Sequence, residues 1–320
     1  MSENLSEHVA ENRRYWDAMA DEWVSFGERA WESEARWGEW GIPNTELPLL
    51  ADEMHGQRAI ELGCGTGYVS AWMRRRGASV YAIDNSEAQL ATARRLSDLH
   101  GLDDIEWVHG NAETVAQPDG SFDFAISEYG AAIWCEPMAW IGEAHRLLRP
   151  GGELVFLGNH PLAMVCSPID GSAPVTERLE RAYFDLGRLD WRDAIDEPGG
   201  IEFNLPISSW IRLFHDIGFD VIDYIEVRAP ESSTGIHGAV AAEWAKRFPS
   251  EQVWRVRKRQ GVADRAALSR RPRSDFHRTF ADGWHEPAMW SREGFSRVDR
   301  HLAPAARGTS RATGSCPAFI

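Results

Sequence analysis

The sequence contains only two lysines, Lys246 and Lys258, among its 320 residues. Its apolar runs are no longer than a β-strand, so we predict no membrane span. The first 20 residues are polar and acidic, unlike a signal peptide. The four cysteines show no paired spacing, which excludes a disulfide framework and a zinc-finger pattern. We therefore expect a protein of the reducing cytoplasm, with no metal site.

Charge is distributed unevenly along the chain. The formal net charge is −15, but residues 261–320 hold ten arginines against six acidic residues and therefore carry +4. The first 260 residues carry the remaining −19. Such a surface repels nucleic-acid phosphates and anionic membranes, and we expect neither as a partner. Residues 261–320 also lack sustained periodicity, which predicts a poorly ordered basic tail.

Short apolar runs alternate with helical patterns between residues 58 and 157. This alternation predicts an α/β fold with a Rossmann-like, mostly parallel sheet and helices on both of its faces. The expected strands are Arg58–Leu62, Ser79–Ile83, Ile105–Val108, Phe122–Ile126 and Glu153–Leu157, and the expected helices are Thr66–Arg76, Ser86–His100 (with Ser86 as N-cap) and Met138–Leu148.

The pattern breaks after the fifth strand and then resumes. Residues 159–205 are aromatic and punctuated by Pro and Gly, and we expect an insertion that forms a lid over a substrate. Two further strands bring the predicted sheet to seven. The resumed elements are helix Ile207–Ile217 ending at Gly218, strand Asp220–Val227, helix Gly238–Phe248 and strand Gln252–Arg257. The predicted organisation is thus an N-terminal helical lid (1–50), a central domain (51–260) and the tail.

A glycine-rich loop, Glu61-Leu62-Gly63-Cys64-Gly65-Thr66-Gly67, follows the first expected strand and opens the first helix. Glycines at alternate positions let the chain turn sharply and let a ligand lie against bare main chain. The dinucleotide fingerprint is G-x-G-x-x-G, whereas this loop reads G-x-G-x-G and has an acidic residue two positions before its first glycine. A carboxylate there opposes a pyrophosphate and favours a ligand with an ammonium group.

The loop and the segments after it resemble the class I S-adenosylmethionine (SAM)-dependent methyltransferases, in the small-molecule, methyltransferase type 11/25-like branch. The resemblance runs from about Asn12 to Arg259 and includes the turn Arg146–Gly152 (RLLRPGG) into the fifth strand. It implies SAM as the methyl-donating cofactor.

Individual residues take their implied roles from this resemblance. Asp84 ends the second strand, where the family has an acid that bonds both ribose hydroxyls. Asn111 stands where the family often has an aspartate at the adenine amino group, and its side-chain oxygen can still accept a hydrogen bond. The cofactor-binding residues implied in this way are Glu61, Gly63, Cys64, Gly65, Gly67, Asp84, Asn85, Asn111, Ala112, Glu113 and Ser127.

Tryptophan is abundant, and five of the 15 lie in the first 40 residues. Trp16 and Trp23 are seven positions apart and share one helical face. In the small-molecule branch an aromatic pair ahead of the glycine loop closes over the cofactor, and an aromatic wall attracts the sulfonium cation. We expect Trp23 and Trp40 at the cofactor, while for Trp16 and Trp31 simple packing of the helix onto the sheet is as good an interpretation.

Methyl transfer from a sulfonium has a neutral leaving group, so it requires alignment and exclusion of water more than an acid. His160, just after the fifth strand, is the candidate general base, because histidine titrates near neutral pH. Its alternative roles are substrate binding and capping of a turn. Glu128 and Tyr129 are second candidates, and together with His160 and Trp191 they are expected to bind a small-molecule acceptor.

Two other functions stay open at this point. One is an NAD(P)-dependent oxidoreductase on a similar sheet, and the other is a SAM-binding protein without catalysis. The acceptor and the oligomeric state do not follow from the sequence.

Deleting residues 261–320 should leave both folding and SAM binding intact, because the glycine loop and every expected element lie before residue 261. The thermal midpoints of the full chain and of residues 1–260 should agree within about 2 °C, the smallest shift that about 1 kcal/mol causes in a domain of this size. A large drop in the midpoint would show that the tail is docked.

Overall fold

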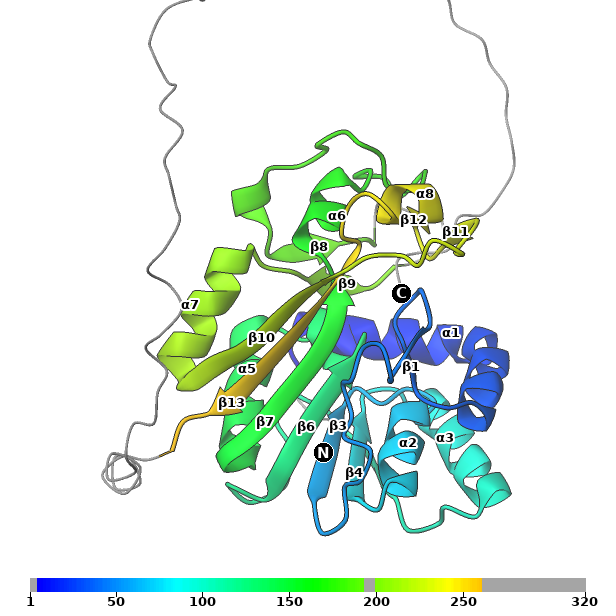
Figure 1. The fold of residues 1–320 in the computed structure, drawn as a ribbon, viewed down its shortest axis with the longest axis vertical. Helices are drawn as coiled ribbons and strands as arrows, with labels where there is room; N and C mark the ends of the chain where they lie inside the picture. The colour runs from blue at the N-terminus through cyan, green and yellow to red at the C-terminus, as the bar shows by residue number, and fades with distance from the viewer. Residues whose placement is uncertain (1–4, 193–198, 261–320) are drawn as a thin grey trace, which may run out of the picture. The chain divides into compact units, whose positions relative to one another are not determined.

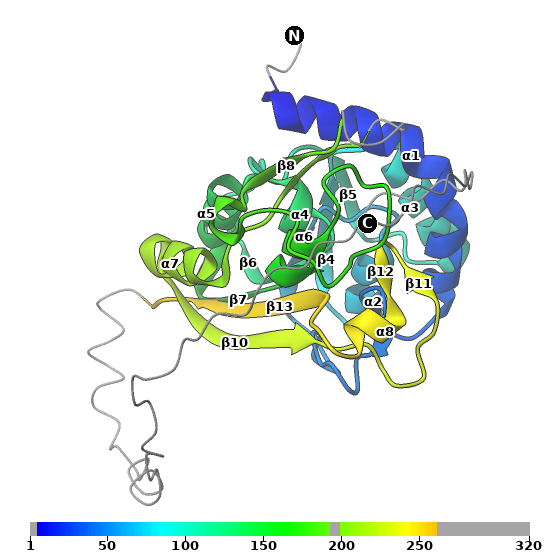
Figure 2. The same ribbon diagram turned by 90° about the horizontal axis from the view of Figure 1, so that it is seen from above.

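The computed structural model describes residues 5–192 and 199–260, and the predicted tail lies outside these ranges. A seven-stranded sheet runs through the centre of this part of the chain (Figures 1 and 2). In spatial order its strands are β10 (Phe219–Val227), β13 (Glu251–Lys258), β7 (Leu148–Asn159), β6 (Phe122–Glu128), β3 (Arg58–Leu62), β4 (Ser79–Asp84) and β5 (Glu106–His109).

The sheet is mostly parallel, as predicted. The five strands from β7 to β5 pair in parallel, whereas β13 is antiparallel to both of its neighbours, β7 and β10. The strand order reverses next to β3, the first strand of the sheet in the chain, with β6 on one side and β4 on the other. Ligands of open α/β sheets bind beyond the carboxyl ends of the strands at such a reversal.

Alternation of apolar side chains along the strands gives the sheet two buried faces. In β3, Ala59 belongs to one core and Ile60 to the other, and Val80 and Tyr81 divide in the same way in β4. One core holds side chains of α2 (Tyr68–Arg75) and α3 (Glu87–His100), and the other those of α4 (Ala131–Trp134), α5 (Pro137–Leu147) and α7 (Ile207–Ile217). Figure 1 shows α2 and α3 at one end of the sheet and α5 and α7 at the other.

Local signals place the helix ends. Ser86 accepts a hydrogen bond from the Gln89 N–H and caps α3, as predicted. Gly218 ends α7 in the left-handed conformation, also as predicted. Among the helices of the described residues, none has both the length and the apolar composition needed to cross a bilayer.

The predicted helix Gly238–Phe248 is wrong. The chain instead forms a hairpin of β11 (Ile236–His237) and β12 (Val240–Ala241), and a helix of only four residues, α8 (Ala242–Ala245), follows. Gly238 lies in the hairpin turn with a φ of 51°, a left-handed value incompatible with a continuous helix. The alanine-rich pattern after it therefore supports a single helical turn.

The N-terminal segment consists of α1 (Glu7–Glu32) and a hairpin of β1 (Arg36–Trp37) and β2 (Ile42–Pro43). In Figure 1, α1 lies across the carboxyl ends of the parallel strands. The fully buried Trp31 fixes its end, because its indole N–H donates to the Thr66 carbonyl in the glycine loop at 2.8 Å.

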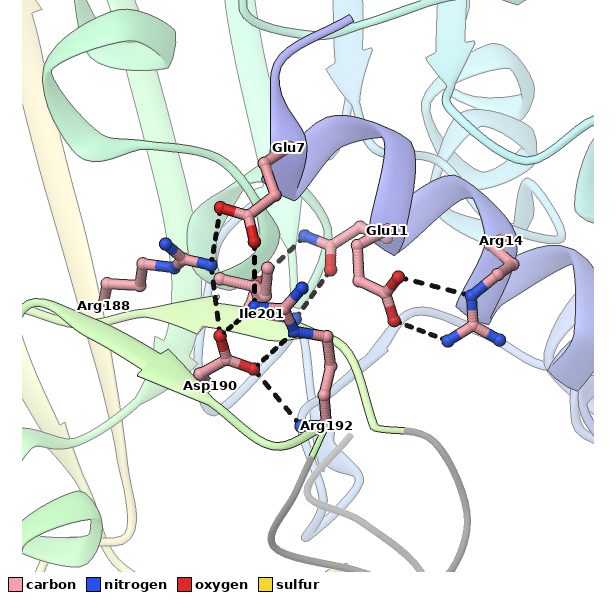
Figure 3. Close-up of polar contacts among 8 residues, drawn as sticks. Glu7, Glu11, Arg14, Arg188, Asp190, Arg192 and Ile201 are labelled. Carbon is pink, nitrogen blue, oxygen red and sulfur yellow. Dashed lines mark hydrogen bonds and ion pairs between the residues drawn. The ribbon is translucent and has the colours of Figure 1, made fainter.

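The insertion after β7 contains α6 (Pro161–Cys166), a short 3-10 helix (Tyr183–Asp185) and a hairpin of β8 (Arg188–Asp190) and β9 (Ile201–Phe203). This hairpin holds the start of α1 (Figure 3). Glu7 forms ion pairs with Arg188 at 3.2 Å and with Arg192 at 2.9 Å, and Asp190 contacts both arginines.

The buried Asn12 connects α1 to two other elements of the fold. Its amide nitrogen donates to the carbonyls of Trp134 and Ile201 at 2.9 Å, and its oxygen accepts from the Ile201 N–H at 2.7 Å. One side chain thus joins α1 to α4 and β9, and all three of its bonds are shielded from water.

Replacing Asn12 with Ala should lower the free energy of unfolding by about 2 kcal/mol or more, because it leaves buried backbone groups without partners. The matched control is Arg14→Ala on the same helix, which removes only an ion pair with Glu11 that is half exposed on the arginine side. That variant should cost less than about 1 kcal/mol. Urea unfolding measures both, and equal losses would contradict the anchoring role of Asn12.

Candidate functional site

A cavity lies beyond the carboxyl ends of β3, β4 and β6, where open α/β sheets bind their ligands. We call it the donor cavity. Nine of the predicted site residues line it, namely Gly63, Gly65, Asp84, Asn85, Asn111, Ala112, Trp23, Glu128 and Tyr129. Its other lining residues were not among the predicted site residues: Val9, Asn12, Trp16, Thr66, Tyr68, Gln89, Gly130, Ala131, Trp134 and Cys135.

The glycine loop forms the floor of the donor cavity, and geometry requires a glycine both at Gly63 in this loop and at Gly130 after β6. Gly63 has a φ of 78°, and a Cβ there would lie 2.6 Å from the Ala131 nitrogen. Gly130 is equally confined, since its Cβ would lie 2.1 Å from the Gly63 carbonyl oxygen. Gly65 differs from both, because nothing lies within 4 Å of the position a Cβ would take. Its bare backbone therefore faces open space.

Asp84 ends β4 and ties the glycine loop to the start of α3. One carboxylate oxygen accepts from the Gly65 N–H at 2.7 Å, and the other accepts from the Ser86 N–H at 2.8 Å. Burial raises the pKa of Asp84, while these two hydrogen bonds favour the charged form. A carboxylate has about four lone-pair positions, so each oxygen retains one for a ligand in the cavity.

Two asparagines line the cavity next to Asp84. Asn85 is bound to α1, because its oxygen accepts from the Arg13 side chain at 2.9 Å and its amide donates to the Val9 carbonyl. The Asn111 oxygen, predicted to accept from a ligand, accepts from the Glu113 N–H at 3.0 Å. It retains a second lone pair for that role.

An aromatic wall from α1 and α4 closes the cavity. The rings of Trp16 and Trp134 meet edge to face with centroids 5.2 Å apart, and Trp23 packs on Trp16 at 5.8 Å. Trp16 thus lines the cavity although its sequence pattern was equally consistent with packing alone. The prediction for Trp40 is wrong, because its buried indole N–H donates to Ser250 and its ring packs on His237, outside the lining of the donor cavity.

Five other residues predicted to bind the cofactor support the cavity without lining it: Glu61, Cys64, Gly67, Glu113 and Ser127. Glu61 is buried behind the loop and accepts from the Ser70 hydroxyl at 2.5 Å, and burial raises its pKa well above the usual value. Ser127 donates to the Leu62 carbonyl and accepts from the Ala132 N–H. Glu113 accepts from the Glu136 N–H at 2.7 Å.

A second cavity adjoins the first, and we call it the acceptor cavity. Its lining residues are Tyr15, Trp16, Met19, Glu22, Trp23, Phe26, Gly38, Glu39, Tyr68, Glu128, Tyr129, His237 and Gly238. Five of these residues also line the donor cavity, which makes them the boundary between the two: Trp16, Trp23, Tyr68, Glu128 and Tyr129. Tyr129 is held at this boundary in a left-handed conformation, with a φ of 52°, by a hydrogen bond from its hydroxyl to Glu251 at 2.7 Å.

The structure does not place His160 in either cavity. Its Nδ1 accepts from the Leu162 N–H and caps α6, so its Nε2 carries the proton and donates to Glu226 at 3.2 Å. Burial lowers the pKa of His160 to about 4 despite Glu226. The prediction of a general base there lacks support from geometry, and capping, its alternative role, is what the structure shows.

Trp191 also lies outside the lining of both cavities. It is buried in the insertion, with the Arg181 guanidinium 5.3 Å from its ring. The predicted lid of residues 159–205 contributes no lining residue to the donor or acceptor cavity from its described part. Instead the acceptor cavity is built by α1, by the β1–β2 turn and by the β11–β12 turn.

A mostly parallel sheet with a glycine-floored cavity at its strand reversal, and an acid at the end of the second parallel strand, is the arrangement of Rossmann-like proteins that bind small ligands. The family described as "Methyltransferase domain" (Methyltransf_11) matches residues 60–156. An S-adenosylmethionine-dependent methyltransferase from Mesorhizobium loti has the same fold, with a TM-score of 0.55 and 24% identity over 69% of this chain and 100% of that one.

Curated relatives give the same answer. A ubiquinone biosynthesis O-methyltransferase from Ruegeria pomeroyi is 34% identical over 177 residues, 51% of this chain and 68% of the relative. A demethylmenaquinone methyltransferase from Clavibacter sepedonicus is 39% identical over 101 residues, but the chain spans only 40% of the length of that relative. The chain likewise spans only 38% of the length of a malonyl-[acyl-carrier protein] O-methyltransferase from Serratia marcescens. The chain belongs to the class I SAM-dependent methyltransferases.

Replacing Asp84 with Ala should weaken binding of S-adenosylhomocysteine (SAH) by a factor of about 30 or more, which corresponds to about 2 kcal/mol. The change removes a charged acceptor and frees the Gly65 and Ser86 N–H groups. Titration calorimetry measures the affinity, and the control is Asp103→Ala in an exposed turn. An unchanged affinity in Asp84→Ala would disprove the assignment.

Proposed function

We propose that this protein transfers a methyl group from SAM to a small-molecule acceptor. The observation that carries the proposal is the boundary of five residues shared by the donor and acceptor cavities, because a methyl group must pass between two ligands in contact. The donor cavity holds the residues that match the family's cofactor motifs, which leaves the adjoining cavity for the acceptor.

The donor cavity suits SAM in the groups it presents. Asp84 retains lone pairs for the two ribose hydroxyls, and Asn85 and Gln89 line the same region. Gly65 offers bare main chain to the ligand. The indoles of Trp16, Trp23 and Trp134 form an aromatic wall suited to a sulfonium cation. Bound there, SAM supplies an activated methyl group.

The residues of the chain contribute alignment and exclusion of water. Asn12 anchors α1 next to the cavities, and the α1 indoles line the boundary where the acceptor would meet the methyl group. A dry boundary prevents water from competing with the acceptor. No acid is required, because a thioether leaves without charge.

A small molecule is the acceptor class that the surroundings favour. Both cavities lie beneath α1, and the −19 charge of the first 260 residues opposes a nucleic acid or an anionic membrane. The names of the relatives refer to ubiquinone biosynthesis, to demethylmenaquinone and to a malonyl carrier protein. A small, non-polymeric acceptor is consistent with the two quinone-related names. The free buried thiols Cys64 and Cys166 support the cytoplasm as the compartment.

A SAM-binding protein that does not transfer methyl groups is the second candidate. One observation favours it: a [4+2]-cyclase, SpnF, shares this fold with a TM-score of 0.53 and 18% identity, so the fold alone does not fix methyl transfer. The NAD(P)-dependent alternative has no support from the family to which the chain belongs.

Incubation of the full chain with SAM carrying a tritiated methyl group and a low-mass metabolite extract tests the proposal. We expect label in an extractable small molecule, and none with Asp84→Ala at the same SAM concentration, because that variant binds the donor weakly. SAH binding without labelled product would favour the binding protein. Binding of NAD without binding of SAH would overturn the family assignment of the site.

A further inference from the structure

The acceptor cavity combines aromatic rings with negative charge. Four aromatic side chains surround its boundary with the donor cavity, and three carboxylates, those of Glu22, Glu39 and Glu128, lie among its lining residues. No lysine or arginine of the described residues lines it. Aromatic faces together with carboxylates form the surroundings that proteins use to bind organic cations.

The carboxylates are crowded together. The Gly38 N–H and the Tyr68 hydroxyl donate to Glu128, and the neighbouring Glu39 N–H donates to Glu251 at 3.0 Å. These bonds bring three acidic residues, Glu39 of the β1–β2 turn, Glu128 of β6 and Glu251 of β13, close enough for their charges to interact. No lysine or arginine is among the groups that raise or lower the pKa values of Glu39, Glu128 and Glu251.

One carboxylate oxygen in this group has no partner. Glu251 is 1% exposed, and its Oε2 makes no hydrogen bond to any described residue. It lines a narrow extension that shares Glu39, Tyr129, His237 and Gly238 with the acceptor cavity. A buried carboxylate without a partner is costly, which favours the protonated form, and a cation that enters the cavity stabilises the charged forms of all three acidic groups.

We propose that the acceptor is an amine that binds the acceptor cavity as its ammonium cation, with Glu39 as the residue that removes its proton. This proposal rests on the proposed function and specifies its substrate class. Glu39 is suited to the task by its place, because it lines the cavity together with Glu128 and His237.

The chemistry requires such a residue. An ammonium group has no lone pair, so its nitrogen must first give a proton to the Glu39 carboxylate. The neutral nitrogen then forms the new bond to the methyl carbon, while the carbon–sulfur bond of the donor breaks and its electron pair stays on sulfur. The product is a methylated ammonium ion and a neutral thioether, and the proton on Glu39 passes to solvent.

The ionisation of Glu39 depends on the groups that face it. Burial and the charge of Glu128 raise its pKa to about 7. Burial likewise raises the pKa of Glu251 to about 8, against the favourable bond from Tyr129. His237, from the β11–β12 turn, also lines the cavity, and its Nε2 faces the Thr234 carbonyl. A cation that binds here therefore displaces protons from the acidic groups.

A matched set of ligands tests the substrate class. Phenethylamine, 2-phenylethanol and phenylacetate have similar shapes and differ in charge, and calorimetry measures their binding to the full chain saturated with SAH. We expect phenethylamine to bind at least tenfold more tightly than the alcohol, and the acid not to bind. Glu39→Gln should reduce the preference for the amine severalfold, whereas Glu106→Gln, on the exposed face of β5, should not change it.

Several outcomes would overturn the proposal. They are equal binding of amine and alcohol, preference for the acid, or no binding of any of the three to a chain that binds SAH. Because SAH binding is measured first, its absence would count against the proposed function instead. A Glu39→Gln chain that no longer binds SAH is replaced by Glu39→Asp, which keeps the charge and should retain the preference.

The charge of phenyltrimethylammonium does not change with pH, so any change of its affinity with pH reports the ionisation of groups on the protein. Its affinity should rise about tenfold from pH 6 to pH 8, because a group with a pKa of about 7 goes from about one-tenth to about nine-tenths ionised. The rise should be smaller in Glu39→Gln. A flat profile in the unmodified chain would count against Glu39, since it would show that no group titrating near neutral pH is coupled to binding of the cation.

Discussion

The contact between two glycines, Gly63 and Gly130, is the constraint on which the cavities depend. It brings the loop after β3 against the loop after β6 at a distance that no side chain would permit. Cavity walls on both sides follow from it: Gly65 stands on the first loop, and Glu128 and Tyr129 stand at the second. Any substitution that separated these loops would change both cavities together.

Most of the sheet could be predicted from the sequence, because strand and helix patterns are local. The alternation from Arg58 onward, the Ser86 cap and the glycine loop each depend on residues close together in the chain. The position of Asp84 at the cavity was predictable for the same reason, since it ends a strand next to the first one. The sequence could not anticipate Gly130, whose partner is 67 positions earlier and is visible only in the packed structure.

The errors have a common physical origin. His160 has the chemistry of a base, but the turn into α6 directs its ring to the Leu162 N–H and Glu226, and sequence gives no sign of that rotation. Trp16 and Trp40 belong to one tryptophan-rich segment, yet only Trp16 lines the donor cavity, because the β1–β2 hairpin carries Trp40 to Ser250. Contacts between residues distant in sequence decide which side of an element faces a cavity. For α1, these are the contacts of Asn12 with α4 and β9.

The shared wall contributed by α1 has a consequence for how substitutions change the two cavities. Trp16 and Trp23 line both cavities, so a substitution at either position alters the fit of the acceptor and of the donor at once. Glu39 and His237, in contrast, line the acceptor cavity and belong to two short hairpins outside the central sheet. Substitutions in these two turns can therefore change the acceptor without changing the donor cavity. Substitutions of the α1 indoles, in contrast, change donor affinity and acceptor choice together.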